Sequence, residues 1–504
     1  MARNLDKESS KKEVSRTTSA QVLEYLLQAA GKQNKDMIAD RNRYREIGFE
    51  DGSARLGWVI PPSWRDVERA LSLFDGLDIV KGKACFIFSG MGGSINTIKA
   101  LIDILWKKSR LRLYTIDSLD PSALKELLTS IRDLSQALVI GISKSGTTKE
   151  TRDLLMTLRE RFQKEGLDYH EHFLWLTDLP QGRVKVEDAG WRDVKLLPIQ
   201  VDNGTDIGGR FTSPHTLIFL IPLFLLLNRE KQQLKELWDT YLSLRKRLLS
   251  EAARSAEELA LTGSNYFAIV LKRELASAME TWTIQLFQES LGSKVPGFNP
   301  KTFVVTREAR SLDFAPVEFK GSSGNAVVDT MVNMYLLQVF VAVFAYYRGV
   351  NFVTQPEVEV YKKKMTEVSS MTIPRPEKVS LDELGKNLKT ISGLTQDKRF
   401  IEAVCYWYLT TEQRASLRST LMDAFPRKEV IVFAGSDWNH HSYQAASKNQ
   451  DTLFLILTKS EYALSVEGIP GKTLEVNIDT LRTIAYATHE TLKDKAANFE
   501  ISEL

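Results

Sequence analysis

Short apolar runs alternate with helix-length segments of mixed polarity through the first half of the chain. The runs are rich in β-branched and aromatic residues, which are typical of strands, and polar residues follow each of them. Strands that alternate with helical segments predict βαβ units and a parallel sheet with helices on both faces. The predicted strands are ACFIFSG (84–90), LRLYTID (111–117), ALVIGIS (137–143) and HFLWLTD (172–178).

A second series of strand-like runs begins after a long segment at 231–249, in which apolar residues recur at helical spacing. This segment predicts a helix that could join two lobes. We therefore expect an α/β protein with an N-terminal arm and helices at 1–55, a first lobe at 56–250 and a second lobe with a C-terminal extension at 251–504. The second series is NYFAIVL (265–271), KTFVVT (301–306), RFIEAVCYWYL (399–409), KEVIVFAG (428–435) and TLFLILT (452–458).

Composition and charge narrow the function classes. The 504 residues are 43% hydrophobic and 26% charged, as in ordinary globular proteins. The net charge of +3 gives no broad field that would favour nucleic acid or an anionic membrane. The two most apolar runs, 216–227 and 334–347, are shorter than the ~20 residues needed to span a bilayer, so they predict buried core helices.

The cysteines and the N-terminus indicate a cytoplasmic protein. Cys85 and Cys405 lie in apolar runs and cannot form a disulfide framework, which predicts reduced core thiols. The first residues, MARNLDKESSKKEVSRTT, lack the apolar stretch of a secretory signal.

Two loops of the first lobe have the composition of phosphate sites. SGMGGSINT (89–97) and SKSGTTKET (143–151) each follow a predicted strand and open a helix. Small residues let the backbone approach a ligand, and hydroxyl and N–H groups at a helix start bind phosphate without a metal. The alternative is two ordinary turns in which Ser and Thr cap helices. The nucleotide patterns fit poorly, because no P-loop is present and Ile95 stands where a dinucleotide fingerprint needs a third glycine.

Five motifs now occur in one order: GMGGS (90–94), SKSGTTKET (143–151), DIGGRF (206–211), QESLGSK (288–294) and QPEVEVYKK (355–363). In this order they resemble the phosphoglucose isomerase family, from about residue 80 to the end. HHSYQAASK (440–448) and LSVEGIPG (464–471) resemble most the divergent isomerase module fused to transaldolase in some bacteria. The resemblance implies two sugar-isomerase (SIS) lobes with an active site between them, and a homodimer.

The resemblance also implies a reaction and a set of roles. Glucose 6-phosphate and fructose 6-phosphate would interconvert through a cis-enediol, with neither metal nor redox cofactor. Glu289 would be the base, and Arg210 would be the cation beside the enediolate oxygen. Gln355 would bind substrate and Lys362 would help to open the sugar ring. The phosphate would be held by Ser94, Ser143, Lys144, Ser145, Thr147 and Thr148.

Each of these roles has a structural alternative. Glu289 could be a surface glutamate at a helix end, and Arg210 could form an ion pair with Asp206 or another acid. Lys144 could be a solvated lysine. Lys362 stands in a run of three lysines, which is most often a solvated helix face.

The family's ring-opening histidine is absent between Glu289 and Gln355, where the chain is largely apolar. Three other histidines are candidates: His215, His440 and His441. The fused relatives carry a His-Ser pair near the C-terminal end, so His441 is the predicted substitute. A loop histidine without a task is the alternative.

Two other functions stay open. The chain could be a phosphosugar-binding sensor or regulatory protein that has lost catalysis, as the missing histidine would allow. It could also isomerise another sugar phosphate, such as mannose 6-phosphate. An enediol base and its arginine favour an enzyme, because a sensor needs only the phosphate loop.

Overall fold

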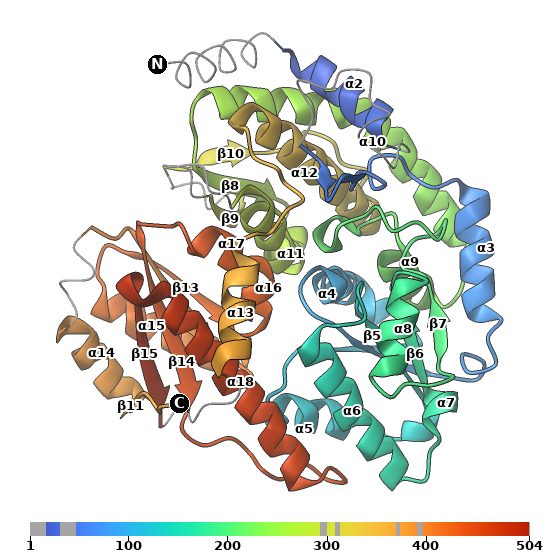
Figure 1. Ribbon diagram of the computed structural model, residues 1–504. Coiled ribbons are helices and arrows are strands. Elements are labelled where there is room, and N and C mark those ends of the chain that lie inside the picture. The colour runs from blue at the N-terminus through green and yellow to red at the C-terminus, as the bar shows by residue number, and fades with distance from the viewer. Residues whose placement is uncertain are drawn as a thin grey trace.

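The computed structural model describes residues 17–30, 47–292, 300–307, 313–368, 373–390 and 397–502, with residues 389–390 described by their backbone alone. Much of the predicted N-terminal arm and the last two residues of QESLGSK lie outside these ranges. Inside them, three parallel sheets are flanked by helices (Figure 1), which confirms the predicted α/β class.

The first sheet has the strand order β4-β3-β5-β6-β7, and all neighbours in it are parallel. Side chains alternate across it, so Phe86 and Phe88 of β3 enter one hydrophobic core while Cys85 and Ile87 enter another. Its strands are β3 (Cys85–Ser89), β4 (Arg112–Ile116), β5 (Ala137–Ile142), β6 (Phe173–Leu176) and β7 (Lys195–Leu197).

The strand order places a ligand site at one point of this sheet. The chain leaves β3 toward β4 on one side, and leaves β5 toward β6 on the other. Ligands bind beyond the carboxyl ends of strands where the order reverses in this way. The two loops that the sequence singles out, 89–97 and 143–151, follow β3 and β5 and therefore flank that point.

The strands of the second half form two sheets rather than one. The five-stranded parallel sheet has the order β11-β15-β14-β12-β13, and the three-stranded parallel sheet has the order β10-β8-β9. The predicted strands at 265–271 and 301–306 are present, but in the smaller sheet. The strands are β8 (Tyr266–Leu271), β9 (Lys301–Thr306), β10 (Ala315–Val317), β11 (Glu377–Val379), β12 (Phe400–Cys405), β13 (Glu429–Ala434), β14 (Thr452–Lys459) and β15 (Ala496–Ile501).

Helices cover the sheets and connect them. In Figure 1, α4 to α8 surround the first sheet, while α10 and α12 lie with the three-stranded sheet. The first-half helices are α2 (Ser19–Ala29), α3 (Trp64–Asp75), α4 (Gly93–Leu105), α5 (Pro121–Ser130), α6 (Lys149–Lys164), α7 (Tyr169–His172), α8 (Gln181–Asp188) and α9 (Leu217–Leu226). A short antiparallel pair, β1 (Phe49–Glu50) and β2 (Ser53–Ala54), precedes α3.

The second half continues from one long helix, α10 (Lys231–Leu261), which includes the predicted joining segment. The division expected after residue 250 falls inside this helix, so the domain limits stay a prediction. The remaining helices are α11 (Arg273–Leu291), α12 (Ala326–Arg348), α13 (Val358–Val368), α14 (Leu381–Thr390), α15 (Thr411–Ala424), α16 (Asp437–His441), α17 (Tyr443–Ala446) and α18 (Gly471–Leu492).

The two most apolar runs form buried helices, as predicted. α9 is buried throughout, and α12 packs along α10. The side chain of Asn325 caps the start of α12 by accepting from two backbone N–H groups, and Gly349 ends it at a φ of 66°. In length and composition α12 could cross a membrane, yet every residue of its most apolar window is buried inside the protein. Cys85 and Cys405 are also buried and free, as expected.

A buried ion pair joins the two sheets of the second half. Lys301 of β9 contacts Glu402 of β12, and their side chains are 2% and 1% exposed. The indole N–H of Trp438 donates to the same carboxylate over 3.3 Å. Removal of one partner from a buried pair leaves an uncompensated charge, which costs more than the pair contributes.

Lys301→Met is expected to destabilise the protein by about 3–5 kcal/mol because Glu402 stays buried without its partner. The double variant Lys301→Met/Glu402→Leu is expected to recover most of this loss. Lys235→Met, at an exposed pair with Asp239, serves as the control and should cost at most about 1 kcal/mol. Urea denaturation measures all three. A loss in Lys301→Met no larger than in the control would contradict the role of the pair.

Candidate active site

A polar cavity of about 640 Å³ lies at the carboxyl end of the first sheet. Five of the six predicted phosphate residues line it: Ser94, Lys144, Ser145, Thr147 and Thr148. The sixth, Ser143, is 2% exposed, and its hydroxyl lies 3.1 Å from that of Thr148. The structure therefore brings the predicted phosphate residues together.

The loop after β5 presents its backbone to this cavity. Gly146 has a φ of 67°, and a side chain there would meet the carbonyl oxygen of Gly182 at 2.9 Å. Thr148 precedes the first residue of α6, and no side chain caps this helix start. N–H groups at an uncapped helix start, beside the paired hydroxyls of Ser145 and Thr147 (2.6 Å apart), suit an anion.

Positive charge at the cavity comes from three elements. Lys144 lies 3.7 Å from Asp178. Burial lowers the pKa of Lys144, an effect that Asp178 opposes, and burial raises the pKa of Asp178 to about 6. Arg55 and Lys185 also line the cavity, and sequence reasoning missed both. An anionic group would therefore meet three basic side chains, two of which, Lys144 and Arg55, already pair with Asp178 and Glu50.

A buried ion pair lies behind this cavity. Arg210 donates to Glu289 over 2.9 Å, and their side chains are 2% and 6% exposed. Arg210 also donates to the hydroxyl of Ser290 and to the carbonyl oxygen of Phe352, over 2.8 and 2.6 Å. Arg210 thus pairs with the predicted base rather than with Asp206. Glu289 is buried near the end of α11, not on the surface.

The surroundings of Glu289 shift the pKa of its carboxyl group and fix its orientation. Burial raises the pKa of Glu289, while Arg210 and the amide of Gln285 oppose the shift. Gln285 lies one helical turn earlier on α11 and donates to the second carboxylate oxygen over 2.9 Å. Its own oxygen accepts from Asn96 of α4 over 3.0 Å, so the orientation of Glu289 is fixed from both halves of the chain.

The turn GMGGS connects the polar cavity of the first sheet, which we call the phosphate cavity after its predicted ligand, to the Arg210–Glu289 pair. A side chain at Gly93 would meet the carbonyl oxygen of Gly209 at 2.3 Å, next to Arg210. The N–H of Gly92 donates to Asp437 of α16 over 2.9 Å. Ser94, in the same turn, lines the cavity. The turn that lines the cavity through Ser94 therefore packs, through Gly93, against the backbone beside Arg210.

A second carboxylate reaches the site from the phosphate loop. Glu150, in the first turn of α6, is 2.8 Å from the Nε2 atom of His440 on α16. Burial disfavours a charged imidazole, but the Glu150 carboxylate outweighs it and raises the pKa of His440. Burial acts to raise the pKa of Glu150, but the interaction with His440 lowers it more, so the pKa of Glu150 is below its usual value. The backbone oxygen of His440 also accepts from Gln285, over 3.4 Å.

His441, the predicted substitute histidine, lies in a different environment. Its Nδ1 atom is 2.6 Å from the hydroxyl of Ser442, and its ring packs against Phe433. Burial lowers its pKa to about 4, so it is neutral over the physiological range. These contacts place it beside Asp437 (3.9 Å) rather than at Glu289 or Glu150. His215 is buried between Trp58 and Tyr241.

Neither Lys362 nor Gln355, the last two predicted residues, is among those that line the cavity. Lys362 of α13 is half exposed and pairs with Glu359 over 2.9 Å. It is close enough to His440 for its charge to oppose part of the rise in the pKa of that imidazole. Gln355, just before α13, is half-buried.

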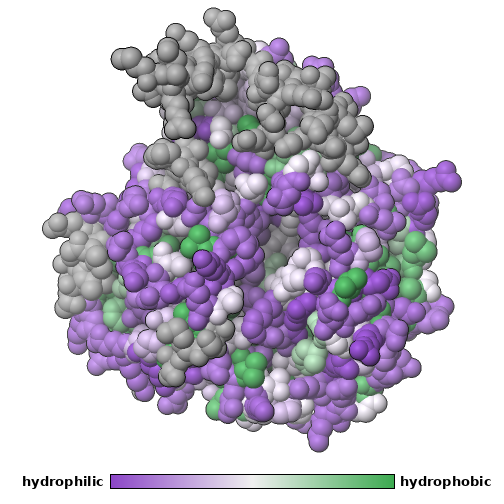
Figure 2. All heavy atoms as spheres, in the orientation of Figure 1, coloured by the Kyte–Doolittle hydropathy of each residue, from purple (hydrophilic) through white to green (hydrophobic). Residues whose placement is uncertain are grey.

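Figure 2 shows a hollow near the middle of the face in view, in the region where Figure 1 places α4 and α11.

Sequence reasoning missed part of this arrangement, although signals were present. Glu150 belongs to the loop already singled out, and Gln285 stands four residues before Glu289, on the same helix face. No sequence pattern distinguishes His440 from its neighbour His441. Among the described residues, no group of three or more His, Cys, Asp or Glu side chains could hold a metal ion.

Comparison of the sequence with known proteins gives relatives named glucose-6-phosphate isomerase. No family model matches the chain. It is 34% identical over 114 residues to a glucose-6-phosphate isomerase of Acaryochloris marina, which is 22% of this chain and 20% of the relative. It is 25% identical over 279 residues to the one of Campylobacter jejuni, which is 53% of this chain and 65% of the relative. The chain thus spans less than two thirds of these relatives.

A solved structure extends the likeness to the fold. The glucose-6-phosphate isomerase of Chlamydia trachomatis superposes with a TM-score of 0.51 at 16% identity, over 77% of this chain and 88% of that one. The chain therefore resembles glucose-6-phosphate isomerases in sequence and in fold. The closer likeness to transaldolase-fused modules stays a prediction.

Arg210→Met is expected to raise the pKa of Glu289 further, because the buried carboxylate loses its countercharge. A raised folded-state pKa leaves stability intact where the carboxyl is protonated and lowers it as pH rises through that pKa. The extra destabilisation should therefore grow between about pH 5 and about pH 8, toward about 3–5 kcal/mol.

Urea denaturation of wild type and Arg210→Met at the two pH values measures this growth. The double variant Arg210→Met/Glu289→Gln lacks the titrating group, so the pH-dependent part should disappear. Equal destabilisation by Arg210→Met at both pH values would show that Glu289 and Arg210 are not electrostatically coupled.

Proposed function

We propose that this protein is an aldose–ketose isomerase that interconverts glucose 6-phosphate and fructose 6-phosphate through a cis-enediol. The observation that carries the proposal is the buried Arg210–Glu289 pair, which the turn at Gly93 and Ser94 connects to a polar cavity suited to an anion. The relatives' names support the same reaction. The predicted homodimer stays a prediction.

The pair supplies what proton transfer between two adjacent carbons requires. Glu289 takes the proton from C2 of the open aldose, and the carbonyl oxygen at C1 becomes an enediolate oxygen. Arg210, held by Ser290 and Phe352, stabilises that negative charge with a guanidinium that needs no reorganisation. The C2 hydroxyl passes its proton to the oxygen at C1, directly or through water. Protonated Glu289 then returns its proton to C1 as the C2 carbonyl forms, which gives the ketose and regenerates the carboxylate. Its raised pKa suits a group that must both accept and donate.

Ring opening comes first, and His440 is the residue best placed for it. The Glu150 carboxylate raises the pKa of His440, so its imidazole can carry the proton that the ring oxygen needs. His440 donates this proton as the bond between the ring oxygen and the anomeric carbon breaks, and water accepts the proton of the anomeric hydroxyl. Lys362 lies within electrostatic range of His440 and stays a candidate for this step. His441 is less suited to donate the proton, because its ring is neutral and bonds to Ser442.

Two rival functions differ in what they need from the site. A phosphosugar sensor needs the cavity, but it has no use for a buried carboxylate beside an arginine. An isomerase of mannose 6-phosphate would use the same pair on the other C2 configuration. Turnover of glucose 6-phosphate, fructose 6-phosphate and mannose 6-phosphate by the purified protein distinguishes these functions, because a sensor would convert none of them.

Glu289→Gln is expected to lower turnover of fructose 6-phosphate by ~10³-fold or more, because the amide cannot take the proton. Binding of the sugar phosphate should persist, because the phosphate cavity is unchanged. A coupled assay for glucose 6-phosphate and calorimetric binding measure the two effects. Glu274→Gln, exposed at the start of the same helix, is the control and should keep full activity. Unchanged turnover in Glu289→Gln would remove Glu289 from the reaction.

His440→Asn is expected to abolish catalysed ring opening, which can be observed alone in the Glu289→Gln background. The Glu289→Gln variant cannot isomerise the sugar, but it should still speed the exchange of the α and β anomers of glucose 6-phosphate. NMR exchange spectroscopy measures this exchange. Adding His440→Asn should slow this exchange ~10²-fold or more, and adding His441→Asn should leave it nearly unchanged. The reverse ranking would return the role to His441.

A further inference from the structure

A second cavity, of about 360 Å³, lies between α18, β14, β15 and the segment 373–376. None of its lining residues lines the phosphate cavity. Its floor is one face of the five-stranded sheet, where Thr458 of β14 stands opposite Glu500 of β15, with Asn498 two residues before Glu500. Its wall is the face of α18 that carries Asp479, Arg482, Thr483 and Tyr486 at helical spacing.

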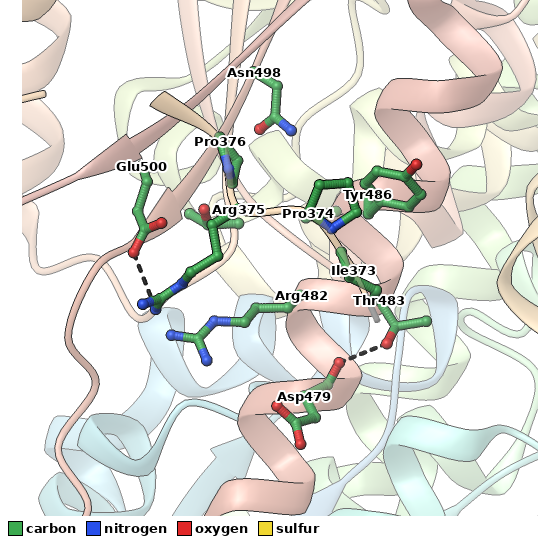
Figure 3. Close-up of a pocket in the computed structure, with 12 residues that line it drawn as sticks. Ile373, Pro374, Arg375, Pro376, Asp479, Arg482, Thr483, Tyr486, Asn498 and Glu500 are labelled. Carbon is green, nitrogen blue, oxygen red and sulfur yellow. Dashed lines mark hydrogen bonds and ion pairs between the residues drawn. The ribbon is translucent and has the colours of Figure 1, made fainter. Parts of the chain in front are cut away.

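Two guanidinium groups lie at one end of this cavity (Figure 3). Arg375 is already neutralised, because it pairs with the buried Glu500 over 3.1 Å and donates to the backbone of Ser460. Arg482 has no ion pair among the described residues, and its guanidinium lies 5.4 Å from the centre of the Tyr462 ring. The remaining acid, Asp479, is exposed, so solvent screens its charge. This end of the cavity therefore favours an anion.

The other end is suited to the body of a small polar molecule. Figure 3 shows Tyr486 and Pro374 beside each other, with Asn498 above them. The side-chain oxygen of Asn498 is buried and has no hydrogen-bond partner among the described residues. A buried polar atom without a partner costs free energy, and a ligand hydroxyl would satisfy it. The flat Tyr486 and Pro374 surfaces would cover the carbon skeleton.

We propose that this cavity is a second ligand site, specific for a small hydroxylated anion that carries a phosphate or a carboxylate. The anionic group contacts Arg482, and a hydroxyl donates to Asn498. A volume of about 360 Å³ matches a metabolite of a few carbon atoms.

Through α18, such a ligand is connected to helices α6 and α16 of the candidate active site. On its opposite side, the amide of Asn477 donates to Thr157 of α6 over 3.0 Å. Farther along, Thr488 accepts from Asn439 of α16 over 2.8 Å. The helix that walls the second cavity thus holds both the helix of the phosphate loop and the helix of His440.

Calorimetry and hydrogen–deuterium exchange with glycerol 3-phosphate as the probe test the proposal. We expect wild type to bind two molecules per chain, one in each cavity, with protection from exchange at 479–486 as well as at 143–151. Arg482→Gln is expected to weaken the second site at least tenfold and to remove its protection, while the phosphate cavity keeps its own. Arg254→Gln, an exposed arginine on α10, is the matched control and should keep both sites.

Three results would overturn the proposal. These are a single bound molecule per chain in wild type with protection only at 143–151, two unchanged sites in Arg482→Gln, or equal weakening by Arg254→Gln, which would indicate non-specific attraction. Because the proposed reaction depends on Glu289 and the phosphate cavity, none of these results would bear on it. Asn498→Leu provides a second variant, which should weaken glycerol 3-phosphate more than inorganic phosphate.

Discussion

The site depends on one buried ion pair, Arg210 with Glu289. Both charges are almost fully removed from water, so each is tolerated only because the other is 2.9 Å away and further hydrogen bonds satisfy the remaining donors and acceptors. Burial also keeps the pKa of Glu289 above that of an ordinary glutamate. The buried Arg210–Glu289 pair is therefore both a structural contact and the proposed site of proton transfer.

Three parts of the chain must meet for this pair to exist. Arg210 comes from the segment after the first sheet, Glu289 from α11, and Gln285 links α11 to Asn96 of α4. The glycines of GMGGS allow the close approach, since a side chain at Gly93 would overlap the backbone of Gly209. The same turn reaches the phosphate cavity through Ser94. Packing over a few residues thus connects the cavity proposed to bind phosphate with the pair proposed to transfer the proton.

The sequence predicted those features that short-range patterns determine. Alternating strands and helices predicted the α/β class, and the loops of small hydroxyl residues after β3 and β5 predicted residues that line one polar cavity in the structure. Arg210 and Glu289 could be named only through the resemblance, because their contact joins residues 79 positions apart. The split of the second strand series into two sheets also depends on long-range pairing, which no local pattern reports.

His440 illustrates the remaining limit. Two adjacent histidines on a short helix point to different surroundings, and only the packed structure shows that one meets Glu150 while the other meets Ser442. The chain thus has a histidine with a raised pKa beside Glu150, although it lacks a histidine between Glu289 and Gln355.

The most direct test of the central claim is isomerisation of fructose 6-phosphate by the purified protein in D₂O, with the product analysed by NMR. A carboxylate that carries the proton between C1 and C2 exchanges some of it with solvent, so we predict deuterium at C2 of glucose 6-phosphate. Turnover with no deuterium at C2, even after many cycles, would contradict an enediol mechanism with Glu289 as its base.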